Sequence, residues 1–277
     1  MNFGIISILK KSLAMENRAT EQQDRELFDR IAKNYAKKDE TGSSSLARQY
    51  QLMFAVRGVL EEQKHFDQII DIACGVGAPA KYLQGYYDQY LGIDYSKNLI
   101  EAARVFNQGN QKASFLARNI KKIEGGQIQE KGDLVLSIGA LHHMTEIDEV
   151  VERLCQIAKP NAFFVAIEPQ RANPFFQVLR WLRAKTDKSY SADQHFFSKK
   201  EFRELFERHR FTDIEIEYQG FFSPVFAQVV MKPQVIFIPL SKIAILLDRL
   251  LDKILPSFLK FLSWNIVVRA KFPKHNI

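Results

Sequence analysis

Residues 68–94 read QIIDIACGVGAPAKYLQGYYDQYLGID. An apolar run ends at Asp71, a turn with Gly75 and Gly77 follows, and a helix-length segment leads to a second apolar run that ends at Asp94. This order predicts a strand, a helix and a second strand parallel to the first. Glycine adopts positive φ and lets a ligand approach the backbone, and the start of a helix offers unpaired N–H groups. We therefore expect a nucleotide-type site, with Asp94 placed to accept hydrogen bonds from the hydroxyls of a ribose.

Three more apolar segments, at 114–118, 132–138 and 161–167, continue the alternation of strands and helices. Five such strands predict a parallel sheet with helices on both faces. Segments 212–219 and 265–272 alternate apolar with polar residues, as strands near the edge of a sheet do. The sequence thus predicts an α/β fold with seven strands.

Candidate site residues follow the carboxyl ends of the first four strands, the edge at which open α/β sheets bind ligands. They are Asp71 with its glycine turn, Asp94, Asn119, and the segment SIGALHHM at 137–144. The segment DIACGVG at 71–77 and the Leu-His-His at 141–143 resemble the class I S-adenosylmethionine-dependent methyltransferases of the small-molecule type. The resemblance covers residues 68–168 well and the flanks poorly. It implies a seven-stranded, mostly parallel Rossmann-like sheet with an antiparallel last strand, and S-adenosylmethionine as the cofactor.

By this resemblance the glycine loop faces the methionine part of the cofactor, and Asp94 faces the ribose. Asn119 stands where the family more often has Asp at the adenine amino group, and its amide keeps an acceptor oxygen. Tyr95 and Ile120 are expected on the two sides of the adenine ring. The predicted cofactor-binding residues are Asp71, Ala73, Gly75, Gly77, Asp94, Tyr95, Asn119, Ile120, Ser137 and Gly139.

Methyl transfer to an acceptor that is already nucleophilic needs mainly alignment, whereas a hydroxyl acceptor benefits from a general base. His142 and His143 are the predicted catalytic residues, because imidazole titrates near neutral pH. Either ring could instead only shape the pocket. The predicted acceptor contacts are Tyr35, Tyr50, Glu168 and His195, for which structural roles are equally open.

The chain has 277 residues, a formal net charge of +7 and a pI near 9.2. Such charge suits nucleic acid or an anionic membrane, but the basic residues are scattered and form no long run. The Ser-Ile-Gly-Ala at 137–140 also lacks the Asn-Pro-Pro-aromatic type of motif found in methyltransferases of nucleic-acid bases, so that substrate class is disfavoured. Cys74 and Cys155 are too few for a disulfide scaffold or a metal cluster, which predicts no metal and a cytoplasmic location.

We expect an N-terminal helical cap at 1–63, a cofactor-binding core at 64–220, an apolar helical insert at 221–263, and the last strand with the tail at 264–277. In the cap, Thr20 begins a predicted helix, and residues 37–45 form a predicted polar linker. The first residues place an apolar run before lysines, the reverse of a secretory signal, and Met15 is an alternative start.

The insert contains a predicted amphipathic helix from Ile243. Its apolar stripe consists of Leu246, Leu247, Leu250, Leu251, Ile254 and Leu255. Its charges interrupt it too often for a transmembrane span. The stripe could pack on the core, pair with a partner, or lie in the surface of the inner membrane as a peripheral contact.

Two other functions compete with methyl transfer to a small-molecule or lipid-like acceptor. A nicotinamide-dependent oxidoreductase could use the same glycine loop, but Ala80 replaces its third glycine and no hydride-transfer partner set stands out. A membrane-docked, non-catalytic interaction module could use residues 221–263. The first and last functions can coexist, since a membrane-bound methyltransferase could take its acceptor from the bilayer.

Overall fold

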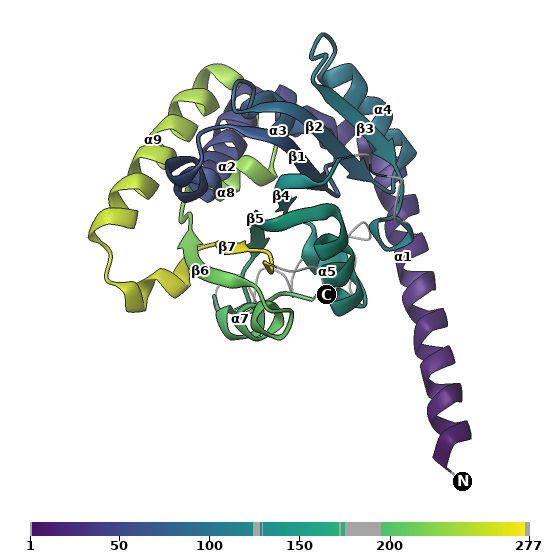
Figure 1. The fold of residues 1–277 in the computed structure, drawn as a ribbon. Helices are drawn as coiled ribbons and strands as arrows, with labels where there is room; N and C mark the ends of the chain where they lie inside the picture. Colours follow the sequence, from purple (N-terminus) through teal and green to yellow (C-terminus); the bar gives the residue numbers. More distant parts are fainter. Residues whose placement is uncertain (1, 124–127, 129, 172, 175–194, 275–277) are drawn as a thin grey trace.

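The computed structural model describes residues 2–123, 128, 130–171, 173–174 and 195–274, with side chains from residue 21 onward (Figure 1). A seven-stranded sheet in the order β3-β2-β1-β4-β5-β7-β6 forms its centre. The strands are β1 Phe66–Ile72, β2 Tyr87–Asp94, β3 Ala113–Ala117, β4 Gly132–Ile138, β5 Ala158–Pro169, β6 Thr212–Gln219 and β7 Asn265–Lys271. The first five are parallel, and β7 runs antiparallel to both β5 and β6. The predicted fold class is therefore confirmed.

Helices cover both faces of this sheet, as Figure 1 shows. They are α1 Asn2–Glu40, α2 Gly42–Glu62, α3 Ala78–Tyr82, α4 Lys97–Phe106, α5 Ile147–Ile157, α7 Lys199–Arg208, α8 Ser223–Gln228 and α9 Gln234–Ile254. Short 3-10 helices η1 Ile120–Lys122, η2 Leu141–His143 and η3 Ser257–Leu262 join them.

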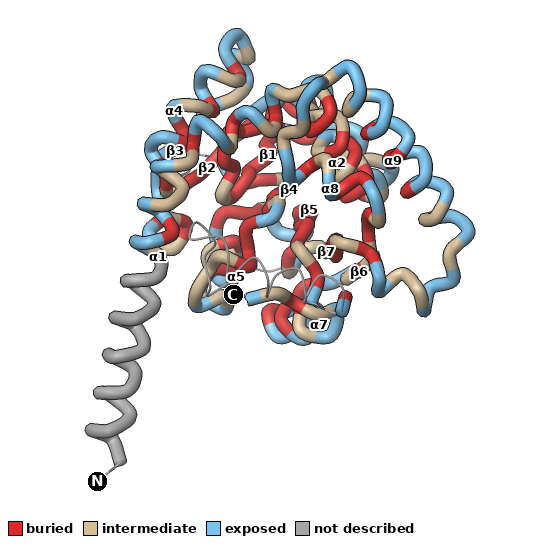
Figure 2. Tube along the Cα trace, turned by 180° about the vertical axis from the view of Figure 1, so that it is seen from behind, coloured by how far each residue is buried: buried red, intermediate tan, exposed pale blue. Residues whose placement is uncertain are grey.

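The two faces have separate apolar cores. On one face, Leu154 of α5 and Phe202 of α7 pack with the sheet. On the other, Val56 of α2 and Leu83 after α3 do so. Figure 2 shows the central strands, such as β1 and β4, mostly buried between these layers, whereas the edge strands β3 and β6 are more exposed. Strands that are apolar on both sides need both covers, which is why the parallel part of the sheet reads as continuous hydrophobic runs.

The N-terminal cap differs from the prediction. Thr20 lies within α1, which begins at Asn2, and the expected linker at 37–45 is almost entirely helical. Only Thr41, in an extended conformation, separates α1 from α2. Asp39 and Ser43 are buried, and the Asp39 carboxylate accepts a 2.7 Å hydrogen bond from Arg48. The polar residues of this stretch therefore make tertiary contacts between two helices. Their composition alone is typical of a loop, which is why the linker was predicted.

The insert between β6 and β7 forms α8, α9 and η3 and packs against α2. Helix α9 starts at Gln234, well before the predicted start at Ile243, and contains Pro239. Its apolar stripe faces outward, since Leu246 is 66% exposed and Ile254 is 64% exposed. Packing on the core, one of the expected alternatives, therefore does not hold for Leu246, Leu247, Leu250 and Ile254, whereas Leu251 and Leu255 are half-buried. Among the residues that the structure describes, no helix has the length and apolarity to cross a membrane.

Candidate active site

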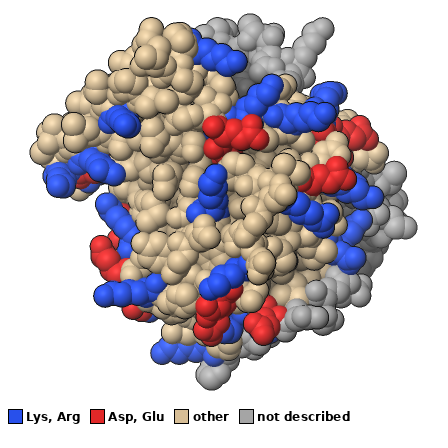
Figure 3. Space-filling model, turned by 90° about the horizontal axis from the view of Figure 1, so that it is seen from above, with Lys and Arg blue, Asp and Glu red and all other residues tan. Residues whose placement is uncertain are grey.

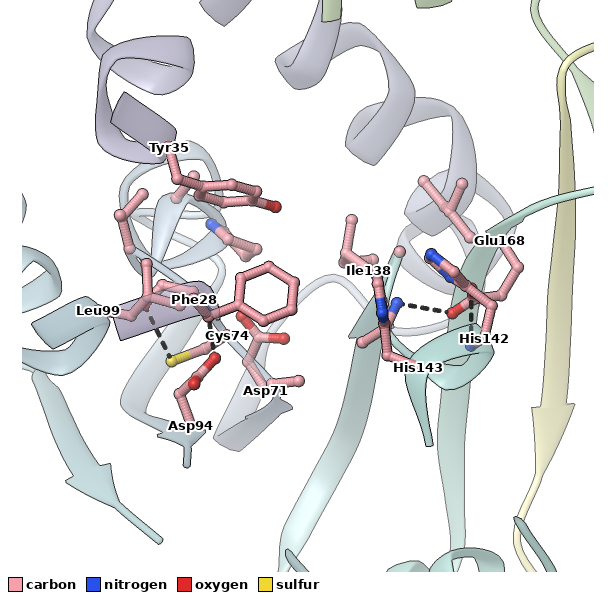
Figure 4. Close-up of a pocket in the computed structure, with 18 of the residues that line it drawn as sticks. Phe28, Tyr35, Asp71, Cys74, Asp94, Leu99, Ile138, His142, His143 and Glu168 are labelled. Carbon is pink, nitrogen blue, oxygen red and sulfur yellow. Dashed lines mark hydrogen bonds and ion pairs between the residues drawn. The ribbon is translucent and has the colours of Figure 1, made fainter. Parts of the chain in front are cut away.

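A cavity of about 620 Å³ opens at the carboxyl edge of the parallel strands, with α1 across it. That volume is typical of sites for small molecules and cofactors. Figure 4 shows its two sides: Tyr35, Asp71 and Asp94 lie on one, and His142 with Glu168 lies on the other. The sheet therefore brings together residues that are almost a hundred positions apart.

The glycine loop forms one wall of the cavity. Ala73, Gly75 and Gly77 all have positive φ, at 50°, 55° and 65°. A Cβ on Gly75 would stand 3.3 Å from the ring of Tyr35 at the cavity, whereas one on Gly77 would stand 2.4 Å from Phe115. Gly75 and Ala73 line the cavity, but Gly77 does not. Gly77 has a packing role, because its missing side chain leaves room for Phe115. Its predicted contact with the cofactor stays a prediction.

Asp94 closes this loop. One carboxylate oxygen accepts the Gly75 N–H at 3.0 Å, and the other accepts the Ser96 N–H at 2.9 Å. Burial raises the pKa of Asp94 to about 6, although these backbone hydrogen bonds oppose the rise. Each carboxylate oxygen has a second lone pair, so the group can still accept from a ligand hydroxyl.

Asp71 is the more unusual carboxylate. One oxygen accepts a hydrogen bond from the Tyr90 hydroxyl, and the other is buried with no hydrogen-bond partner in the described part of the chain. Burial, opposed by the Tyr90 hydrogen bond and assisted by the Asp94 charge, raises the pKa of Asp71 to about 7. A buried acceptor without a partner costs stability unless a ligand satisfies it.

The predicted adenine contacts also line the cavity. Tyr95, Asn119 and Ile120 lie on the side of β2 and β3. The Asn119 side-chain oxygen accepts the Lys121 N–H at 2.9 Å, and its amide nitrogen donates to Glu21 of α1. Asn119 thus ties the cap helix to the cavity while it retains one lone pair for a ligand.

Gly139 and Ser137, at the end of β4, differ in position. Gly139 has a φ of 69° and lines the cavity, with open space where a Cβ would stand. Ser137 is fully buried within β4, opposite Ile72 of β1, and lies outside the cavity lining. The resemblance implies that the backbone around Ser137 to Gly139 holds the amino acid end of the cofactor, and within this stretch Ile138 and Gly139 line the cavity.

Glu168 holds the histidine segment in place. One of its oxygens accepts the N–H groups of Ala140 at 2.9 Å and Leu141 at 2.7 Å. The other lies 2.6 Å from Nδ1 of His142. Glu168 is fully buried and also lines the cavity, and its hydrogen bonds orient His142. Its predicted contact with the acceptor stays a prediction.

The two histidines face the cavity from η2. The His142 ring stacks on Phe196 at 5.6 Å and lies 4.1 Å from the ring of His143. Nδ1 of His143 lies 3.3 Å from a carboxylate oxygen of Asp24 in α1. A carboxylate that binds Nδ1 of an imidazole fixes its tautomer and directs Nε2 as a base, an arrangement that fits His142 better than His143.

The three remaining residues predicted to contact the acceptor differ in their position relative to the cavity. Tyr35 lines the cavity above Gly75. Tyr50 and His195 do not line it. The Tyr50 hydroxyl donates to Asp252 of α9 at 3.2 Å, and the exposed His195 ring packs edge-on against Phe197. The structure therefore does not place these two side chains in the cavity lining, and the acceptor contacts predicted for them gain no support from it.

Several lining residues come from parts of the chain with no recognisable motif. They are Phe28 of α1, Phe196, Gln228 and Val229 at the end of α8, and Trp264 with Asn265 at the start of β7. For Gln228, Val229 and Trp264 the signal in the sequence is the apolar character of the insert, but nothing local predicts that its two ends meet the cavity.

Residues 70–166 match a family model described as a methyltransferase domain. This match identifies residues 70–166 as a methyltransferase domain. The sheet with its antiparallel β7 has the fold of the class I S-adenosylmethionine-dependent methyltransferases, whose cofactor is S-adenosylmethionine. The match does not favour the oxidoreductase alternative.

Among curated proteins, an uncharacterized methyltransferase of Schizosaccharomyces pombe is 30% identical over 106 residues, which cover 35% of this chain and 37% of that protein. A ubiquinone biosynthesis O-methyltransferase of Rickettsia typhi is 25% identical over 145 residues, or 50% of this chain and 56% of that protein. The chain thus spans only about a third to a half of the length of these relatives.

Among solved structures, a methyltransferase of Thermotoga maritima, described as a possible histamine N-methyltransferase, has the same fold. It superposes with a TM-score of 0.60 at 14% identity and covers 90% of this chain and 99% of its own.

The residues present fit S-adenosylmethionine. The unpartnered oxygen of Asp71 suits a cationic ammonium group, and the Asp94 carboxylate suits paired hydroxyls. A side chain at Gly75 would fill the space between the loop and Tyr35.

Proposed function

We propose that the chain transfers a methyl group from S-adenosylmethionine to a hydroxyl oxygen of a small-molecule or lipid-like acceptor. The observation that carries this proposal is the pairing of His142 with the buried Glu168 on the side of the cavity opposite Asp71 and Asp94. Nitrogen and carbon acceptors need such a base less, because a neutral amine or an enolate is already a nucleophile.

The cofactor half of the proposed site lies around the glycine loop. Asp71 would bind the ammonium group of the methionine part, and Asp94 would bind the ribose. Tyr95, Asn119 and Ile120 would enclose the adenine. The cofactor supplies a methyl group on a sulfonium, which leaves as a neutral thioether when the methyl is attacked.

The acceptor half lies between η2, Tyr35 and the end of the insert. His142 would take the proton of the acceptor hydroxyl while the oxygen–methyl bond forms and the sulfur–methyl bond breaks. Glu168 would act as a positioning residue: it holds Nδ1 of His142 and stabilises the imidazolium that results. The lining by Phe196, Val229 and Trp264 suits an acceptor with an aromatic or aliphatic body.

One of the relatives supports an oxygen acceptor. The Rickettsia typhi protein is named as an O-methyltransferase of ubiquinone biosynthesis. We propose an acceptor of related chemistry, a phenolic hydroxyl on a ring that carries an apolar substituent.

The first experiment tests the cofactor. Isothermal titration with S-adenosylhomocysteine should give binding that Asp94→Ala weakens at least about tenfold, since that change removes a charged acceptor. His195→Asn is the matched control, because its side chain lies outside the cavity. Absence of binding by the folded chain would refute the proposed function.

The second experiment tests the base. The chain is incubated with S-adenosylmethionine and a panel of catechols and hydroquinones, with and without alkyl tails, and products are detected by a gain of one methylene in mass. His142→Asn should lower kcat roughly a hundredfold or more and leave the affinity for S-adenosylhomocysteine unchanged. Glu168→Gln should shift the pH profile of kcat, which a purely structural role would not do. Equal turnover by the wild-type chain and His142→Asn would refute the role of His142.

A further inference from the structure

The surface of the insert is apolar and has few partners within the molecule. Its exposed large apolar side chains are Phe222, Val225, Val229, Val235, Ile236, Leu240, Ile243, Leu246, Leu247, Leu250, Ile254, Phe258, Phe261 and Leu262, which we call the insert face. On α9, Ile236, Leu240, Ile243, Leu247, Leu250 and Ile254 follow one another at helical spacing. Contiguous exposure on this scale marks a surface that binds something.

Polar contacts hold α9 with this face outward. The Ser43 N–H donates to the side chain of Gln234 at 2.9 Å, and the Ser241 hydroxyl donates to the Ser43 carbonyl at 2.8 Å. The Tyr50 hydroxyl reaches Asp252 at the other end of the helix. The side of α9 that meets α2 is thus anchored by hydrogen bonds, and rotation of the apolar stripe inward would break them.

The charges around the insert face have one sign. Lys232, Lys242, Arg249 and Lys253 are all exposed. Within residues 221–263, all of which the structure describes, the acids are Asp248 and Asp252, and neither is an exposed residue.

Both acids are used inside the molecule. The buried Asp248 accepts the N–H groups of Phe221, Phe222 and Ser223 at 2.9–3.0 Å. Asp252 accepts from Tyr50. In Figure 3 the left part of the molecule, where α9 lies in Figure 1, is mostly uncharged, with Lys and Arg side chains along its margin.

The insert face is continuous with the cavity. Val229 belongs to both, since it is 53% exposed and also lines the cavity at the end of α8. Gln228 beside it and Trp264 at the end of the insert also line the cavity. A molecule that sits on the insert face therefore lies next to the acceptor half of the site.

We propose that the insert face docks the protein on an anionic lipid bilayer. An exposed apolar helix with basic flanks and phenylalanines at one end has the composition of an interfacial membrane helix. A second copy of the chain fits less well, because a two-fold contact of this face with itself would bring its lysines together without any carboxylate. Delivery of the acceptor from the bilayer to the cavity rests on the proposed function, whereas docking on the bilayer is independent of it.

The test is co-sedimentation of the full chain with vesicles, in the absence of cofactor and acceptor. One set of vesicles is pure phosphatidylcholine, and in the other about a third of the lipid is phosphatidylglycerol. We expect binding to the anionic vesicles at least about tenfold stronger than to the neutral ones, weakening as salt is added.

The apolar contribution is tested with Leu246→Asp combined with Leu250→Asp. Both side chains are more than half exposed, so the folded state should tolerate the change. Binding should fall at least about tenfold. Val105→Asp is the matched control, because Val105 is 73% exposed on α4, outside the insert, and binding should stay the same. Circular dichroism confirms that each variant is folded.

The electrostatic contribution is tested with Lys242→Glu and Lys253→Glu. Each reversal should lower binding to anionic vesicles roughly fivefold or more and leave the weak binding to neutral vesicles unchanged. Lys200→Glu, at an exposed position on α7, is the control.

Three results would overturn docking: no binding by the wild-type chain, equal losses in the control variants, or a lipid-free dimer that the Leu246→Asp, Leu250→Asp variant converts to a monomer. The last result would show that a second copy covers the insert face. Titration with S-adenosylhomocysteine does not depend on any of them, so failure of docking and failure of the proposed function are separate outcomes.

Discussion

Substitution of Asp71 by Asn tests how the buried acid of β1 affects stability. The pKa of Asp71 is raised from 3.8 to about 7, chiefly by burial, so the native state keeps its proton where the unfolded chain loses it. Stability therefore falls as pH rises from about 4 to about 7, and above pH 7 the buried charge costs roughly 4 kcal/mol.

The substitution would remove that cost but bury an amide nitrogen without an acceptor, at about 1–2 kcal/mol. We therefore expect Asp71→Asn to be more stable than the wild-type chain by about 2–3 kcal/mol at pH 8. Near pH 4.5, where wild-type Asp71 keeps its proton and little of that cost remains, the difference should vanish or change sign. Loss of the Asp71 charge also eases ionisation of Asp94, which adds to the gain at high pH.

The measurement is urea unfolding of both proteins at pH 4.5 and pH 8. Asp67→Asn is the matched control, because its side chain is on the same strand but 77% exposed. It removes no buried charge, so it should not reproduce the gain in stability at pH 8. If Asp71→Asn gains no more stability at pH 8 than at pH 4.5, the account of Asp71 is wrong. The gain in stability should come with weaker binding of S-adenosylhomocysteine, since the proposed partner of the ammonium group is lost.

Three further substitutions test the loop and the insert by thermal and urea unfolding. Ala73→Gly should stabilise the chain by about 0.5–1 kcal/mol, because Ala73 has a φ of 50° that glycine adopts without strain; a loss would show that its methyl group packs better than supposed. Gly77→Ala should cost at least about 2 kcal/mol, since the new Cβ would meet Phe115 at 2.4 Å, and wild-type stability would contradict that contact. Asp248→Ala should cost about 2–4 kcal/mol because it leaves three N–H groups at the start of α8 unpaired, of which that of Ser223 is buried and the other two are partly buried. The loss should be smaller for Asp248→Asn, and equal losses would argue against a hydrogen-bonding cause.

The parallel half of the sheet could be predicted because its signals are local. A strand buried on both faces has a continuous apolar sequence. The turn after β1 needs residues that tolerate positive φ, so the glycine at position 75 could be recognised as part of a turn. The ends of such strands meet at one edge, which is why Asp71, Asp94 and Asn119 could be expected at one cavity.

The rest depends on contacts between distant segments. Glu168 could be singled out by its place after β5, but its role is set by N–H groups more than twenty residues earlier. The outward orientation of α9 could not be predicted for a similar reason. In the sequence, Asp248 and Asp252 suggest a face of the helix in contact with solvent, but in the structure they bind partners on α8 and α2. Periodicity gives the apolar stripe but not the direction in which it points.

The insert begins and ends at a single point of the sheet. The Trp264 N–H donates to the Gly220 carbonyl at 2.7 Å, and the side chains of Asn265 and Gln219 are hydrogen-bonded at 2.9 Å, so β6 and β7 are joined before the insert departs from them. A segment closed at its base in this way can lengthen, shorten or be exchanged without a shift in the register of either strand. The insert can therefore change in evolution as one module, and with it the proposed acceptor specificity and membrane contact. The residues around the glycine loop, which are proposed to bind the methyl donor, remain unchanged.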